Sequence, residues 1–454
     1  MTFPLRNLKI KKELMKRERK MRCNMEKLYL GIAREKITPE IGCNLCGYYP
    51  DIYSDCIVDD LTVDACYLRQ GDTQALMVSA AVCAIDADIC DSIRTQVQAR
   101  FGIPAENCMI SAIHTHSGPC LMEMEGWGGV DVPYLENIFM PGVLKAIESA
   151  VAEPVAVTVG VAEGDSFVGM NRRELTVENK IKLGQNPWGP FNPRMTVIDF
   201  KDEAGQSVAT MVHYGCHPTS AGHNTQVTRD WPGVMIDRLE EKTGGMVSFF
   251  NGPEGDVGPR ISNGKTIGND SMDYVYELGA VAAADAKRIY SQITDYTTPE
   301  LKVFCDRCEI PLRPRMTRAE AEAIYEENKD KTKNVAALMK LTAQKVMDAW
   351  DAGEPEEKSK GFDQTVIAIG DRVFTSFPYE IFSEIGMRID QAMPHIHVLP
   401  TVLTNGSYGY FVTEDTIFRG GYEVRSFLYK SSQTYCKDAD FALMNATLEN
   451  LKKL

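Results

Sequence analysis

Short runs of β-branched and other apolar residues recur along the chain from Leu28 onward, and turn-forming residues separate them. Runs of about four to eight such residues predict β-strands that are buried on one or both faces. We therefore expect strands at residues 75–82, 109–113, 155–161, 195–200, 208–214, 246–250, 365–369, 373–377 and 397–403.

Longer stretches between these runs place apolar residues at helical spacing. They predict helices at residues 85–101, 133–152, 231–242, 274–292 and 381–393. The mixture of strands and helices predicts an α/β fold with a large, mixed β-sheet core flanked by helices.

Residues 317–351 differ from the rest of the chain. Thr317 and Glu320 form a capping box at the start of an Ala/Glu/Lys-rich run that continues to Trp350. A solvated turn, GEPEEKSKG, follows this run. We predict a helical excursion inserted between two parts of the main body, which acts as a lid or flank rather than as a domain.

Charge and composition exclude several classes of partner. The 454 residues carry a formal net charge of −14, so we expect no nucleic-acid partner and no stable association with an anionic membrane surface. No stretch approaches the ~20 consecutive apolar residues of a membrane span. The partner that remains is a small molecule, and the oligomeric state is left open.

The cysteines and the first residues bear on location and boundaries. Thirteen cysteines are scattered, mostly in apolar runs, which favours buried free thiols and a reducing, cytoplasmic location. Residues 1–25 hold nine Lys/Arg against only Glu13 and Glu18. They are either a disordered basic arm that binds a partner or, as we favour, an extension that the compact domain at 26–454 does not need.

Two histidine clusters follow predicted strands. His114 and His116 come directly after strand 109–113, and strand alternation would place both on one side. His217 follows strand 208–214, with His213 and His223 nearby. Strand ends are where α/β folds place their sites, and imidazole is the commonest metal ligand. Alternatively, the first pair is solvated at the surface and one of the second group caps a carbonyl.

Acidic and tyrosine residues follow further strands. Glu380 comes after strand 373–377, where it could merely favour a helix N-terminus. Tyr410 lies in NGSYGY, a segment that would ordinarily be packing. The loop FNGPEGDVGPR at 250–260 carries Glu254 and Asp256 and is either a shaped wall of a site or a long surface turn.

Taken in order, these segments resemble the neutral/alkaline, non-lysosomal ceramidase family. The resemblance covers most of the chain from Leu28 onward. It rests on LGIAREKITPEIG, SAIHTHSGP, MNRRE, GCHPTS, FNGPEGDVGPR, FPYEIFSEIGMRI, and NGSYGYFVT with YE at 422–423.

The resemblance implies one zinc ion, and it assigns a role to seven residues. Two imidazoles, a carboxylate and a phenol oxygen suit zinc and leave a position for water, which the metal would activate. His116 would shuttle a proton or bind the oxyanion, while Tyr422 and Arg172 would hydrogen-bond the tetrahedral intermediate or the substrate. The implied zinc ligands are His114, His217, Glu380 and Tyr410.

Two departures from the family pattern bear on the substrate. Gly258 stands where the family has serine, and the sequence ends at Leu454, where the family continues into a C-terminal β-sandwich domain. We therefore expect a zinc-dependent hydrolase of an amide or ester bond that acts on an N-acylated small molecule rather than on membrane ceramide.

Two other functions remain open. One is a metal-dependent hydrolase of a phosphoester or glycan, whose sign would be a second metal ion held by Asp256, Glu254 or Asp230. The other is a non-catalytic relative that keeps the fold to bind a ligand.

Overall fold

The structure is a computed structural model that describes residues 26–48, 51–123, 128–263, 271–429 and 431–454. The basic extension predicted at 1–25 lies outside the described residues. Among the described residues, no helix is both long and apolar enough to cross a membrane.

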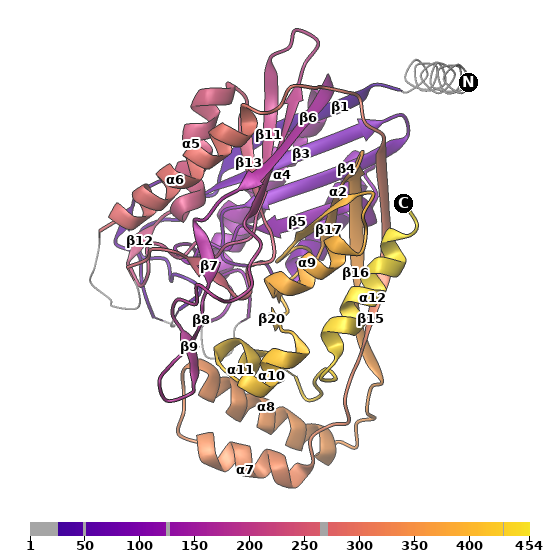
Figure 1. The fold of residues 1–454 in the computed structure, drawn as a ribbon. Helices are drawn as coiled ribbons and strands as arrows, with labels where there is room; N and C mark the ends of the chain where they lie inside the picture. The colour runs from indigo at the N-terminus through magenta and orange to yellow at the C-terminus, as the bar shows by residue number, and fades with distance from the viewer. Residues whose placement is uncertain (1–25, 49–50, 124–127, 264–270, 430) are drawn as a thin grey trace, which may run out of the picture.

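An eight-stranded mixed sheet forms the core, as the sequence predicts (Figure 1). Its two edges are parallel pairs, β11/β13 and β4/β5, whereas the strands between them pair antiparallel. In spatial order the strands are β13 (Met246–Asn251), β11 (Ser207–Tyr214), β10 (Arg194–Lys201), β6 (Val155–Asp165), β1 (Leu28–Lys36), β3 (Thr62–Gln70), β4 (Thr73–Ala80) and β5 (Cys108–Ala112).

A second sheet of four strands packs on one face of the first. Its inward residues, such as Ile367 and Phe374, share one apolar cluster with Leu30, Leu68 and Met211 of the large sheet. The pair β17/β19 is parallel. The strands are β15 (Leu301–Pro311), β16 (Ser359–Ile369), β17 (Arg372–Ser376) and β19 (His397–Thr401).

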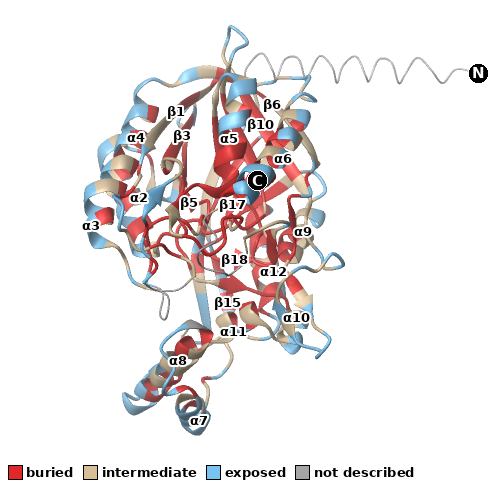
Figure 2. Ribbon diagram, turned by 90° about the vertical axis from the view of Figure 1, so that its left-hand side faces the viewer, coloured by how far each residue is buried: buried red, intermediate tan, exposed pale blue. Residues whose placement is uncertain are grey.

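Helices cover the outer face of each sheet, which gives four layers (Figures 1 and 2). The large sheet is covered by α2 (Ala87–Phe101), α4 (Met140–Ala152), α5 (Asp230–Thr243) and α6 (Asp273–Tyr290). The small sheet is covered by α9 (Ser383–Gln391) and α12 (Ala439–Leu451). The helix predicted at 133–152 is interrupted, because a short helix at Val132–Tyr134 and a π-turn at Leu135–Phe139 precede α4.

The helical excursion is present, but as two helices rather than one run. Helices α7 (Arg318–Asn328) and α8 (Asn334–Asp351) form a hairpin that extends from the end of the sheets (Figure 2). The predicted capping box starts α7, where the Thr317 hydroxyl accepts from the Glu320 amide. Ala321, Ala343 and Val346 pack the two helices together.

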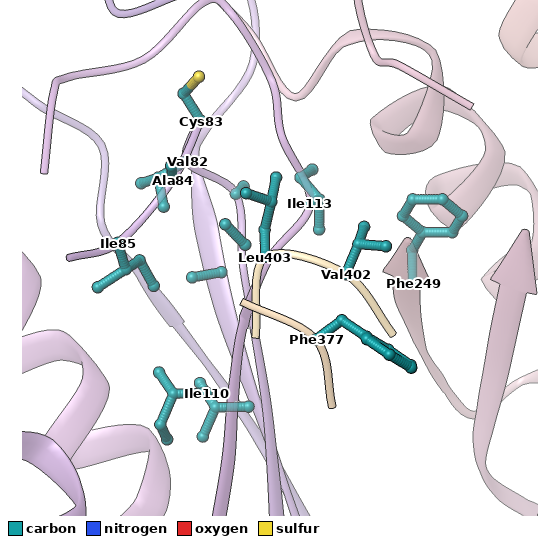
Figure 3. Packing of buried hydrophobic residues seen from close by; sticks show 14 of the residues in the cluster. Val82, Cys83, Ala84, Ile85, Ile110, Ile113, Phe249, Phe377, Val402 and Leu403 are labelled. Atoms are coloured by element: carbon teal, nitrogen blue, oxygen red, sulfur yellow. The ribbon is translucent and has the colours of Figure 1, made fainter. Parts of the chain in front are cut away.

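The two sheets contain three parallel strand pairs, and all three end at one place, where Asn251 connects them. Its side-chain amide donates to Ile113 O, after β5, at 3.1 Å. Its side-chain oxygen accepts from the Cys216 amide, after β11, at 3.2 Å, and its own carbonyl accepts from Val402 N, after β19, at 3.1 Å. Figure 3 shows the apolar side chains of these strand ends packed together: Val82, Ile113, Phe249, Phe377, Val402 and Leu403.

We predict that Asn251→Ala destabilises the protein by about 2–5 kcal/mol, because it leaves two buried backbone groups unmet at about 1–3 kcal/mol each. Urea unfolding should show a lower midpoint with an unchanged m-value. Asn328→Ala is the matched control, since Asn328 is also buried but donates only to Ile324 within α7. An Asn251→Ala midpoint equal to that of wild type would show that Asn251 is not the connection described above.

Candidate metal centre and active site

Four buried side chains bring their nitrogen and oxygen atoms to one point. One ligand atom from each of His114, His217, Glu254 and Glu380 lies within 4.8 Å of all the others. They follow β5, β11, β13 and β17 respectively, so all three parallel pairs contribute.

Local backbone geometry turns His114 into this cluster. Strand β5 ends at Ala112, and His114 has φ of +77°, a left-handed conformation that is strained for a residue other than glycine. Its amide donates to Val82 O and its Nδ1 to Cys83 O at 2.7 Å, which fixes the ring. A turn, and not continued strand alternation, therefore brings His114 and His116 together.

Backbone carbonyls set the orientation of both imidazoles. His217 Nδ1 donates to Glu254 O at 2.9 Å and lies 3.0 Å from Val257 O. His114 Nδ1 is held by Cys83 O in the same way. With Nδ1 protonated in each ring, both Nε2 atoms carry a lone pair that points to the centre, as in metal-binding histidines.

The centre holds acceptors without matching donors. Glu380 Oε2 lies 3.5 Å from His114 Nε2 and 3.2 Å from His217 Nε2. His217 Nε2, Glu380 Oε2 and both carboxylate oxygens of Glu254 are buried and have no hydrogen-bond partner in the part of the chain that the structure describes. Buried acceptors facing one another are costly unless a cation lies between them. The donor set of imidazoles and carboxylates therefore fits a divalent metal ion such as zinc.

The pKa values of Glu254 and Glu380 are shifted in opposite directions, because these two buried acids lie close together. Burial, reinforced by the charge of Glu380, raises the pKa of Glu254 well above its usual value. Burial opposes ionisation of Glu380 too, but the neighbouring imidazoles of His114 and His217 hold its pKa well below the usual value. Two adjacent carboxylates cannot both ionise in a buried site without added positive charge.

His116 lies beside this cluster. Its Nε2 is 3.2 Å from His114 Nε2, and its ring packs edge-on against Tyr48. Burial, with the neighbouring imidazoles of His114 and His217, keeps the pKa of His116 well below its usual value. Gly47 is required here, because a Cβ at that position would lie 2.4 Å from His116 Nδ1, and its φ is +109°.

Tyr410 and Tyr422 form the opposite wall with Arg172. Two-residue strands β18 (Glu380–Ile381) and β20 (Tyr410–Phe411) pair Tyr410 directly with Glu380. Helix α11 (Tyr422–Leu428) begins at Tyr422, whose ring lies edge-to-face with Tyr410 at 5.5 Å between centroids. Arg172 donates to the Tyr410 hydroxyl at 2.9 Å and pairs with buried Glu423 at 3.0 Å. Burial raises the pKa of both tyrosines, so their hydroxyls stay protonated.

A cavity of about 200 Å³ is lined by five of these residues: His114, His116, Glu380, Tyr410 and Tyr422. Its buried lining includes His114 and Glu380, whereas Glu123 and Lys345 are exposed, so the cavity opens to solvent on their side. The fold thus brings together His114, His116, His217, Glu380, Tyr410, Tyr422 and Arg172, all of the site residues that the sequence predicts.

Other residues noted in the sequence have structural roles. His213 Nε2 donates to Pro400 O at 2.9 Å, so this histidine caps a carbonyl and stays outside the ligand cluster. Asp256 accepts from Asn171 and Ser383, and Asp230 accepts from the amides of residues 220, 221 and 231. Neither aspartate is available to hold a second metal ion.

Glu254 is the residue that the sequence interpretation misplaced. The sequence marks it only as a possible ligand of a second ion, whereas its carboxylate lies in the same cluster as His114, His217 and Glu380. The available signal was its position three residues after the end of β13, at the same edge as the other strand ends.

No family model matches the sequence. The neutral ceramidase of Pseudomonas aeruginosa is 25% identical over 234 residues, which is 46% of this chain and 34%, about a third, of that protein. The crystal structure of neutral ceramidase from Pseudomonas aeruginosa superposes with a TM-score of 0.72 and 19% identity, covering 94% of this chain and 75% of that one.

A ceramidase complexed with C2 gives a TM-score of 0.70 at 16% identity, with 94% of this chain and 76% of that one covered. The chain has the fold of the neutral ceramidases. The ceramidase fold therefore extends over nearly all of the chain, as the resemblance implied.

We predict that the protein binds about one zinc ion per chain, and that His114→Ala, His217→Ala and Glu380→Ala each weaken binding by more than about a hundredfold, since even partners outside the ligand set contribute 10–100-fold. Competition with a chelator measures this affinity, and added zinc should raise the melting temperature of wild type but not of these three variants. His213→Ala is the matched control, a buried histidine outside the cluster.

Tyr410→Phe and Glu254→Gln, measured in the same way, identify the further ligand. A comparable loss in Tyr410→Phe supports the phenol oxygen, and a comparable loss in Glu254→Gln supports the second carboxylate. Unchanged zinc affinity in all the His and Glu variants would show that this cluster is not a metal site.

Proposed function

We propose that the protein is a zinc-dependent hydrolase that cleaves the amide, or ester, bond of an N-acylated small molecule. The observation that carries the proposal is the buried cluster of unmatched acceptors at the base of an open cavity, in a chain with the neutral ceramidase fold. His114, His217 and Glu380 would hold the ion together with Tyr410 or Glu254.

The chemistry divides between the ion and the protein. Zinc supplies Lewis acidity, which acidifies a water molecule and polarises the scissile carbonyl. His116, whose Nε2 lies 3.2 Å from His114 Nε2, would accept the proton of the attacking water and pass it to the departing amine nitrogen. An amide and water thereby give a carboxylic acid and an amine.

Two groups on the opposite wall face the negative charge that develops on the carbonyl oxygen. The Tyr422 hydroxyl stays protonated and can donate a hydrogen bond to that oxygen. Arg172 adds positive charge, and its contacts with Tyr410 and Glu423 fix its guanidinium before substrate binds. Preorganised donors of this kind act in the transition state without reorganisation.

The alternatives receive less support. A phosphoester or glycan hydrolase would hold a second ion through Asp256, Glu254 or Asp230, but structural hydrogen bonds hold both aspartates and Glu254 lies in the first cluster. A non-catalytic relative would have no use for His116 and a protonated Tyr422 beside the ion. The cytoplasmic location stays a prediction.

We predict that zinc-loaded protein hydrolyses members of a panel of N-acyl amino acids, N-acyl amino sugars, short-chain ceramides and acyl esters, and that Glu380→Ala does not. Tyr422→Phe should lower kcat by about 10²–10³-fold, the usual effect of removing one oxyanion donor, with zinc content unchanged. Released amine and carboxylate are quantified by chromatography. Equal turnover by wild type and Glu380→Ala would refute the assigned site.

A further inference from the structure

Helix α8 of the excursion forms one wall of the cavity. Val335 and Leu338 pack in one apolar cluster with Met339, Tyr422 and Tyr429. The Thr342 hydroxyl donates to Tyr429 O at 2.7 Å, which fastens α8 to the end of α11. The hairpin is therefore attached to the element that carries Tyr422.

One face of α8 runs from the closed part of the cavity to its mouth. Leu338 and Lys345 both line the cavity and are seven residues apart, which places them on the same side of a helix, roughly two turns from each other. Leu338 is 8% exposed, whereas Lys345 is exposed. Met122, also buried, lies with Leu338 in the lining, and exposed Glu123 lies at the mouth with Lys345.

The size of the cavity limits what can enter. Its volume is about 200 Å³, whereas pockets for drug-sized ligands hold about 300–1,000 Å³. An acyl group of a few carbons fits in the enclosed part beside the scissile bond, and a longer chain would have to extend past Leu338 or out of the mouth.

We propose, building on the amide hydrolase function above, that Leu338 closes the cavity against the acyl group and thereby selects short apolar acyl groups. The polar amine portion of the substrate extends to the mouth at Glu123 and Lys345. The preferred substrate class is therefore a short-chain N-acyl derivative of a polar amine. Leu338 also acts as a positioning residue, because it packs in one apolar cluster with Tyr422.

The test is a series of N-acyl substrates with one amine and acyl chains from two to ten carbons. Wild type should prefer the shortest members. Leu338→Ala should move the preferred length up by about two carbons and change the long-to-short ratio of kcat/KM by about tenfold or more, as expected for methylenes in an apolar pocket. It should also lower kcat on the acetyl substrate, through Tyr422, whereas volume-conserving Leu338→Met should retain the wild-type profile.

Val346→Ala is the matched control. Val346 is buried between α7 and α8 and does not line the cavity, so its truncation loosens the hairpin without enlarging the pocket. An equal shift of chain-length preference in Val346→Ala and Leu338→Ala, or no shift in Leu338→Ala, would overturn the proposal.

Binding of the product-like carboxylates, acetate to decanoate, gives a readout that needs no turnover. Calorimetry on zinc-loaded protein should show the tightest binder becoming about two carbons longer in Leu338→Ala. If no amide is hydrolysed but this shift occurs, the proposed function fails and the role of Leu338 stands. If amides are hydrolysed and neither preference shifts, the role of Leu338 fails and the proposed function stands.

Discussion

The organising constraint of this molecule is a group of buried acceptor atoms that no donor in the described chain satisfies. Two imidazole lone pairs and two carboxylates meet where solvent is largely excluded. Such an arrangement is unfavourable in the free protein. It persists because backbone carbonyls and the strained His114 conformation hold the rings in place. A strained backbone and buried acceptor atoms without hydrogen-bond donors are expected together where a protein binds a cation.

The sheet topology explains how residues so distant in sequence reach that point. Each of the three parallel strand pairs must end with both carboxyl ends at one edge, and the two sheets stack so that the three edges coincide. Asn251 then joins the three strand ends through its two side-chain bonds and its carbonyl. The candidate site at this edge depends on the apolar contact between the sheets as much as on its own side chains.

Much of the fold and of the candidate site was predictable from the sequence, because the residues with reactive side chains directly follow strands that the sequence reveals. The strands before His114, His217 and Glu380 are apolar enough to be recognised, and the residues after them carry the resemblance. Strand β3 was not predicted, because Asp64 interrupts its apolar pattern, and only the fold reveals that Arg34 of β1 pairs with Asp64 at 2.6 Å. Similarly, charged Asp306 and Arg307 obscure edge strand β15. Choosing between His213 and His217, or placing Glu254, requires tertiary contacts that no local pattern contains.

The tyrosine pair connects Gly258, a departure from the family pattern, with Leu338 of α8. Gly258 lies on β14 (Val257–Pro259), where a Cβ would touch Arg172 at 3.4 Å, an ordinary contact, so a serine would fit without displacing the backbone. A side chain at position 258 would influence the site by contacting Arg172, which in turn donates to Tyr410. Leu338 reaches the site from the other side, through Tyr422. Since the two tyrosine rings are in contact, a change at either end alters the same wall of the cavity. Under the proposed function, substrate preference is therefore a property of this wall, while the ligand cluster opposite it is free to keep the same chemistry.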